Sequence, residues 1–130
     1  MIVAYGCVWI ALVLPNLCAV IARVGSRDYG LRLNHDPRAF LGRLDGLAGR
    51  AHAAQLNGFE TTPGFAAGVI IAQLSGNVPW VAIEALAVGF VLSRLLFILF
   101  YLADLAVLRS LAWLGGFTLI TALFGLAILL

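Results

Sequence analysis

The sequence predicts an all-α integral membrane protein that folds as a four-helix bundle. Of its 130 residues, 63% are hydrophobic and 11% are charged, whereas soluble domains carry about 25% charged residues. The apolar residues gather in four runs, and each run is long enough to cross a hydrocarbon core of about 30 Å as a helix. Most of the arginines lie in the segments that connect these runs. The length favours a single domain over residues 1–130.

The basic residues are concentrated in one connecting segment. All eight are arginines, and six of them lie between the first and second apolar runs: Arg23, Arg27, Arg32, Arg38, Arg43 and Arg50. Positive charge is retained on the cytoplasmic side of a membrane, so the loop of about residues 23–50 is predicted to be cytoplasmic and both termini outside. The cluster is interpreted as a topology signal that contacts membrane lipids, with no nucleic acid as a partner.

The first apolar run, residues 2–22, is predicted to be a retained membrane helix, because no positively charged segment precedes it and no signal-peptide cleavage site follows it. Pro15 removes one helical hydrogen bond and is expected to bend the helix; a neighbouring helix or Asn16 could satisfy the freed carbonyl group. Cys7 and Cys18 are too far apart along one helix to form a disulfide.

The second predicted helix runs from about Arg38 to Leu74, after turn signals at Asn34-His35 and Asp36-Pro37. Its first half is expected to project from the membrane, and only residues 53–75 are placed in lipid. Pro63 marks a predicted kink. The spacing of Gly64 and Gly68 is typical of helices that approach one another closely in a bilayer.

The third predicted helix runs from Trp80 to about Asp104, with a membrane span over residues 80–103, and follows an uncharged turn on the opposite side of the membrane. Arg94, Phe97 and Tyr101 share one face of it. A charge within a span indicates a functional site, and Glu60 is the predicted partner of Arg94. A purely structural ion pair is the alternative. Glu84 is interpreted as an interfacial residue near the outer surface.

The fourth predicted helix covers residues 111–130, after a turn around Asp104–Ser110 that holds Arg109 on the arginine-rich side. It is interpreted as a span that faces lipid or fills the bundle.

One stripe of the second helix combines polar and small residues. At the angular step of an α-helix, Arg50, Ala53, Asn57 and Glu60 fall within an arc of about 80°. A bilayer does not tolerate an amide and a carboxylate that face lipid, so this stripe must face a protein interior or an aqueous pocket. With Arg94, Tyr101 and Arg109 at the same end of the bundle, it forms the candidate active site.

The stretch AAQLNGFETTPGF, followed by Arg94, Tyr101 and the pair Arg109-Ser110, resembles the signature R-A-x-x-N-x-x-E-x-x-P of the MAPEG family, the membrane-associated proteins in eicosanoid and glutathione metabolism. The resemblance covers nearly the whole chain. It implies a homotrimer whose sites lie between neighbouring subunits and bind glutathione from the cytoplasmic side. The compact loops resemble those of bacterial members, which implies an inner-membrane location.

The resemblance also implies a role for each site residue. Asn57 and Glu60 would hold the γ-glutamyl end of glutathione, and Tyr101 would orient the peptide. Arg109 would stabilise the thiolate, with Tyr101 or Ser110 as a hydrogen-bond donor. The same resemblance implies that Arg23 or Arg27 contacts a carboxylate of glutathione. Arg50 and Arg94 are expected to be further binding residues because they lie at the same end of the bundle.

The chain departs from the signature at Ala53, where the family has arginine, so Arg50 is the only cation on that face of the helix. Phe97 also replaces a polar residue of some members. The expected function is a glutathione-dependent transferase or peroxidase that acts on a lipophilic electrophile or a lipid peroxide. The alternatives are a non-catalytic member that binds a lipid or partner, an enzyme on this scaffold that does not use glutathione, and a small transporter. His35 and His52 stand alone, so no metal is expected.

Overall fold

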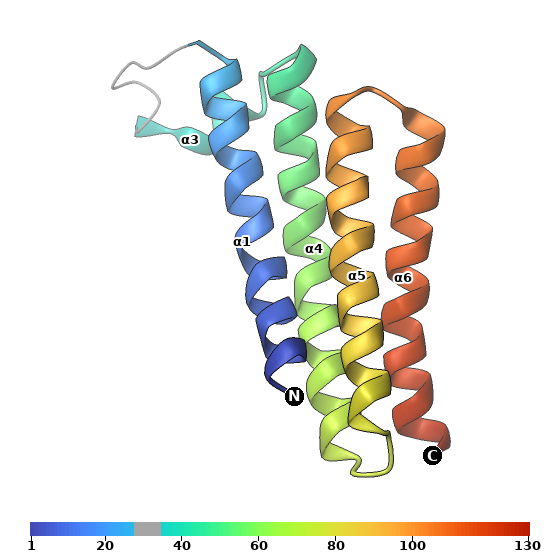
Figure 1. Ribbon diagram of the computed structural model, residues 1–130. Helices are drawn as coiled ribbons and strands as arrows, with labels where there is room; N and C mark the ends of the chain where they lie inside the picture. Colours follow the sequence, from blue (N-terminus) through green and yellow to red (C-terminus); the bar gives the residue numbers. More distant parts are fainter. Residues whose placement is uncertain (28–34) are drawn as a thin grey trace.

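The computed structural model describes residues 1–27 and 35–130, and these residues form an all-helical bundle (Figure 1). The four long helices are α1 (Ile2–Gly25), α4 (Gly46–Leu74), α5 (Trp80–Leu102) and α6 (Ala106–Leu129). A short helix, α3 (Pro37–Leu41), precedes α4. The predicted all-α bundle of four long helices is therefore confirmed for the described residues. Arg32 and Asn34 lie outside the described residues.

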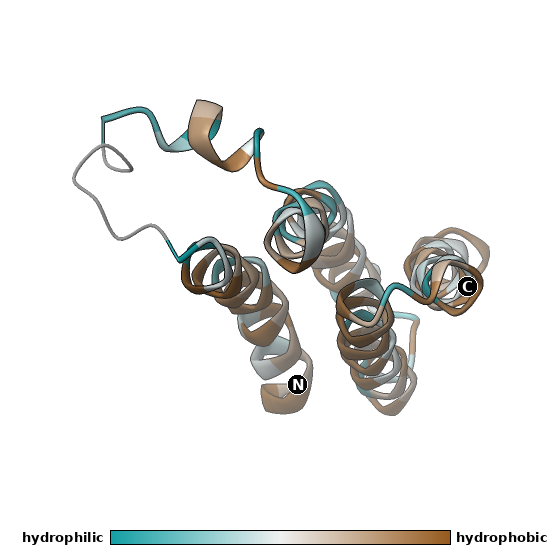
Figure 2. Cartoon of the chain, turned by 90° about the horizontal axis from the view of Figure 1, so that it is seen from above, coloured by the Kyte–Doolittle hydropathy of each residue, from teal (hydrophilic) through white to brown (hydrophobic). Residues whose placement is uncertain are grey.

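The long helices run up and down, so each is antiparallel to its neighbour along the chain (Figure 1). The α3 segment and the α5–α6 connection lie at one end, which we call the loop end, and both termini and the α4–α5 turn lie at the other. Helix α4 contacts α1, α5 and α6. Seen from the loop end, the long helices consist largely of hydrophobic residues, and hydrophilic residues lie in the connections between them (Figure 2).

Three of the helices, α1, α5 and α6, are long and apolar enough to cross a membrane. Helix α4 is longer, at 29 residues, but it carries the polar stripe and does not belong to this group. The chain is therefore an integral membrane protein with three strongly apolar candidate spans and a fourth, more polar helix packed among them.

The second predicted helix is interrupted, which corrects the expectation of one helix from Arg38 to Leu74. Asp36 accepts a hydrogen bond from Ala39 N at 3.2 Å and caps α3, whose first residue is Pro37. The chain then leaves the helix after Leu41 and re-enters it at Gly46, where φ is +59°. This left-handed conformation favours glycine, so Gly46 permits the corner that separates the two helices.

Helices α1 and α4 pack tightly against each other at Pro15 and Gly58. A Cβ on Gly58 would lie 2.6 Å from Pro15 Cγ, so only glycine fits there without a shift. Pro15 has no N–H group, which leaves Ala11 O without its helical donor. The Thr62 hydroxyl lies 3.1 Å from that oxygen and 2.7 Å from Gly58 O and provides the donor. A neighbouring helix thus satisfies the freed carbonyl group, which was one of the two predicted solutions.

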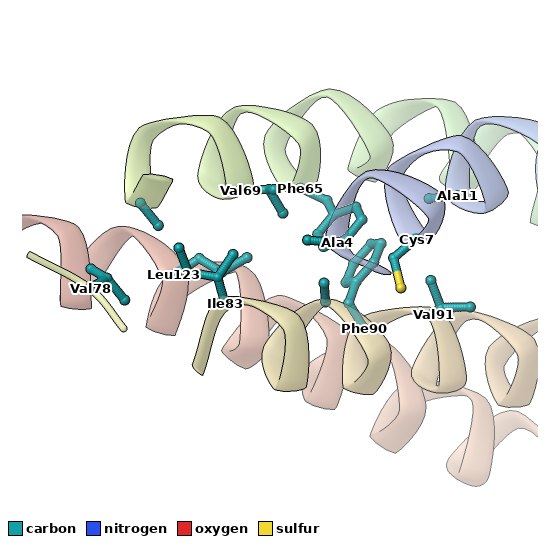
Figure 3. Packing of buried hydrophobic residues seen from close by; sticks show 12 residues of the cluster. Ala4, Cys7, Ala11, Phe65, Val69, Val78, Ile83, Phe90, Val91 and Leu123 are labelled. Carbon is teal, nitrogen blue, oxygen red and sulfur yellow. The ribbon is translucent and has the colours of Figure 1, made fainter. Parts of the chain in front are cut away.

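The largest cluster of buried hydrophobic residues lies between all four long helices toward the end that carries the termini (Figure 3). Phe65 and Phe90 are almost fully buried, and their rings stack with centroids 4.0 Å apart. Gly68 lets α6 approach, because a Cβ there would lie 3.3 Å from Leu123 and Phe124 atoms. A Cβ on Gly64 would meet nothing within 4 Å, so only one glycine of the predicted small-residue pair serves packing within the chain.

The connection between α5 and α6 is shorter than predicted, because α6 begins at Ala106 and not at residue 111. Asp104 turns the chain with φ of +60°, a conformation in which Asp is tolerated better than bulkier residues. Arg109 and Ser110 therefore belong to the first turns of a helix and not to a loop. At the opposite end, Glu84 forms an ion pair with the N-terminal ammonium group of Met1.

Candidate functional site

A groove of about 380 Å³ opens between α4, α5 and α6 toward the loop end, and we call it the polar groove. Its lining residues come from three helices: Ala53, Leu56, Asn57 and Glu60 from α4, Phe97 and Tyr101 from α5, and Arg109, Ser110 and Trp113 from α6. Five residues predicted from the sequence, namely Asn57, Glu60, Tyr101, Arg109 and Ser110, are thus brought together on one surface.

Arg109 lies in the first turn of α6, where its side chain contacts Tyr101 of α5. Its guanidinium carbon lies 4.4 Å from the centroid of the Tyr101 ring, within the range of a cation–π contact. The Ser110 hydroxyl donates to Ala106 O at 3.0 Å within the same helix. Among the described residues the Tyr101 hydroxyl has no hydrogen-bond partner, so the phenol is a more available donor toward the groove than Ser110.

Arg94 is buried behind the groove, with 5% of its surface exposed. Its Nη2 donates to Asn57 Oδ1 at 2.9 Å, and its guanidinium carbon lies 4.1 Å from the centroid of the Phe97 ring. The prediction that Arg94 pairs with Glu60 is therefore wrong. Among the described residues the ion pairs are Met1–Glu84 and Arg50–Asp104. Asn57, and not Glu60, contacts Arg94, because the Glu60 side chain is exposed.

The bond to Arg94 fixes the orientation of the Asn57 amide. A guanidinium group has only donors, so the amide oxygen must face Arg94, and the amide NH₂ group remains for a ligand in the groove. Glu60, three residues further along α4, presents a carboxylate to the same groove. A donor beside an anion is complementary to a zwitterionic amino-acid group, whose carboxylate accepts from Asn57 and whose ammonium faces Glu60.

A second hollow of about 310 Å³ adjoins the polar groove at its loop end, and we call it the side hollow. Ala53 and Tyr101 line both spaces. Arg50 and Asp104 belong to the side hollow alone and form an ion pair there at 3.8 Å. Arg23, in the last turn of α1, lines neither space. Arg27 lies two residues after the end of α1, with φ of +54°, and it also lines neither space.

Sequence reasoning missed several residues that line these spaces, among them Trp113 and Asp104. Trp113 follows Arg109 by four residues, so it lies on the same face of α6; this signal was hidden because the helix was expected to begin only at residue 111. Asp104 was interpreted as the end of a helix, and its approach to Arg50 depends on a contact between α4 and the α5–α6 turn that no local pattern indicates.

The sequence model described as MAPEG family matches residues 3–129, nearly the whole chain. No curated protein and no solved structure matches the chain.

Proposed function

The chain belongs to the MAPEG family, and from this premise we propose that it is a membrane-embedded glutathione-dependent transferase or peroxidase. Its second substrate is a lipophilic electrophile or a lipid peroxide. The observation that carries the proposal is the polar groove, in which an arginine, a phenol, an amide and a carboxylate from three helices face one space.

Glutathione fits the charges and the size of this groove. The molecule has two carboxylates, one ammonium and one thiol group. Asn57 and Glu60 suit the amino-acid end, and Arg109 beside Tyr101 suits the sulfur. The volume of about 380 Å³ lies within the range of roughly 300–1,000 Å³ that is usual for ligand pockets.

Arg109 supplies the chemical activation. Only the thiolate is a strong nucleophile, and a free thiol has a pKa of about 8.5. A guanidinium near the sulfur favours the anion, and a decrease of about two pKa units corresponds to about 2.7 kcal/mol. The Tyr101 hydroxyl can add a hydrogen bond to the same sulfur. The thiol proton passes to solvent, because the arginine has no site to accept it.

Two reactions follow from a bound thiolate. In conjugation the sulfur forms a bond to an electrophilic carbon, and the leaving group departs with its bonding electrons. In peroxide reduction the O–O bond breaks, and two glutathione thiols are oxidised to one disulfide while the peroxide is reduced to an alcohol and water. The apolar substrate enters from the lipid past Leu56 and Trp113, which line the groove and are exposed.

The assembly and the location belong to the same proposal. The groove is open on the outside of the single chain, so a neighbouring subunit of a homotrimer would close it, as the family resemblance implies. The arginine-rich loop end faces the cytoplasm by the positive-inside rule, which gives the groove access to cytoplasmic glutathione. The membrane is then a bacterial inner membrane, with both termini outside.

The proposal is tested by turnover of glutathione with a hydrophobic aryl halide and with a lipid hydroperoxide. Arg109→Ala is expected to reduce kcat/KM by about 10²–10³-fold, the usual effect of removing one electrostatic contact to a developing charge. Arg43→Ala is the matched control, because Arg43 lies at the same end but lines neither the groove nor the side hollow. Equal activity of the two variants would overturn the role of Arg109.

A non-catalytic MAPEG protein is the second candidate, and Ala53 favours it. The signature arginine would stand in the groove at this position, and here the position carries a methyl group. This candidate binds a lipid or a partner through its arginine cluster, and saturable binding of a lipid without turnover of either substrate would support it.

A further inference from the structure

A small cavity lies between α1, α4 and α5, and we call it the inner cavity. It shares no lining residue with the polar groove or the side hollow. Its free volume is about 10 Å³, at the lower limit of roughly 10–15 Å³ that one water molecule needs. Most of its lining is apolar, and its polar side chains are Arg94 of α5 and Thr61 and Thr62 of α4. The inner cavity therefore has room for one small polar molecule and nothing larger.

Arg94 has more hydrogen-bond donors than the described residues accept. A guanidinium carries five N–H groups, and the one hydrogen bond described for Arg94 uses Nη2, which donates to Asn57 Oδ1 at 2.9 Å. No fully buried side-chain nitrogen in the described part of the chain lacks a partner, so Nε and Nη1 of Arg94 must border open space. Arg94 lines the inner cavity and neither the polar groove nor the side hollow. Its remaining N–H groups are therefore available to a molecule in the inner cavity.

The two threonines offer acceptors to the same cavity. Thr61 donates its hydroxyl proton to Asn57 O at 3.0 Å, and Thr62 donates to carbonyl oxygens of α1 and α4 at 3.1 and 2.7 Å. A hydroxyl has only one proton, so both oxygens present lone pairs to the cavity. Water can accept from Arg94 and donate to the threonines. An anion can only accept, and the threonine oxygens would repel it.

We propose that the inner cavity binds one water molecule, which accepts a hydrogen bond from Arg94 and donates to Thr61 and Thr62. Arg94 forms no ion pair with a carboxylate among the described residues, and a buried charge is costly unless its hydrogen bonds are made. Buried waters make about three hydrogen bonds each to polar groups of this kind. The water holds the guanidinium in the orientation in which Nη2 donates to Asn57, and it touches no ligand of the polar groove.

The first test is a crystal structure of the full chain at a resolution that shows ordered waters. One peak of solvent density is expected in the inner cavity, within roughly 2.5–3.2 Å of an Arg94 nitrogen and of a threonine Oγ1. A second crystal soaked in bromide separates water from an anion, because bromide scatters anomalously. The absence of a peak in contact with Arg94, or anomalous density from bromide in the cavity, would overturn the proposal.

Thr61→Val tests the same site in solution, because valine keeps the shape of threonine and lacks the acceptor. The water loses one partner, so the midpoint of thermal unfolding is expected to fall by about 2–6 °C. Thr118→Val is the matched control: the Thr118 hydroxyl also donates within its own helix, to Leu114 O at 2.9 Å, but it is exposed on α6 and does not line the inner cavity. Its midpoint is expected to be unchanged or raised.

Equal midpoints for the two variants would show that no water depends on Thr61 and would contradict the proposed bond. Neither measurement uses glutathione, so a failure of the proposed function would leave this inference unchanged.

Discussion

A hydrogen bond of 2.9 Å connects the buried guanidinium of Arg94 to Asn57, which lines the polar groove. A guanidinium buried to this degree needs an acceptor, and the amide oxygen is the acceptor that the structure provides. The bond therefore has two effects: it satisfies the buried charge, and it turns the amide NH₂ toward the polar groove.

Asn57→Asp separates these two effects. The carboxylate would still accept from Arg94, so the midpoint of thermal unfolding is expected to be retained or raised. It would lack the NH₂ donor, so glutathione affinity is expected to fall by tenfold or more. Thermal unfolding and calorimetry of the same preparation measure both quantities. Asn77→Asp is the control, because Asn77 is exposed in the α4–α5 turn, outside the helices and at the opposite end of the bundle. Full affinity in Asn57→Asp would refute the donor role.

At the scale of elements, the contact between α1 and α4 depends on the absence of one side chain. Gly58→Ala would bring Cβ to within 2.6 Å of Pro15 Cγ, and this overpacking is expected to cost about 1–3 kcal/mol. Gly64→Ala is a matched control in the same helix, where the new Cβ would contact nothing within 4 Å. It is expected to be neutral or slightly stabilising because alanine favours helix.

Thermal unfolding of the two variants in the same detergent measures the difference. A lower midpoint for Gly58→Ala with an unchanged midpoint for Gly64→Ala is expected. Equal midpoints would contradict the account of α1–α4 packing.

The helices were largely predictable from the sequence, because long apolar runs between polar segments leave few alternatives in a membrane. The contacts between helices were less so. The pattern Gly64-x-x-x-Gly68 indicated close approach, yet only Gly68 meets α6, since helix rotation decides which small residue faces a neighbour. Gly58 and its partner Pro15 belong to different helices, and no spacing within one helix could pair them.

At the scale of the whole molecule, the chain is expected to cross the membrane with the loop end inside. Arg43→Cys and Asn77→Cys place thiols at exposed positions at opposite ends, while Cys7 and Cys18 are buried. In intact bacterial cells a membrane-impermeant maleimide is expected to label Asn77→Cys alone, and to label Arg43→Cys only after permeabilisation. The reverse pattern would contradict the proposed topology.

If the proposed function holds, the molecule is expected to assemble as three copies, as the family resemblance implies, and a neighbouring subunit would then close the open side of the polar groove. Native mass spectrometry from detergent is expected to give the mass of three chains. A monomer that retains full turnover would show that no neighbouring subunit is needed to close the groove.

The composition of the site was predictable where its residues share a helix face, as Asn57 and Glu60 do. Which of these residues contact one another was not predictable. Glu60 was assigned to Arg94 by charge alone, whereas position along α4 gives that contact to Asn57. The side hollow could not be predicted, because it depends on how the α5–α6 turn folds over Arg50.

The most direct test of the central claim, that the polar groove binds glutathione, is a calorimetric titration of the purified protein and of Glu60→Gln. Glu84→Gln is the matched control, since Glu84 lies at the opposite end of the bundle. The account predicts saturable binding to the wild type and to Glu84→Gln and at least tenfold weaker binding to Glu60→Gln. Absence of binding to the wild type at millimolar glutathione, or equal binding to Glu60→Gln, would contradict it.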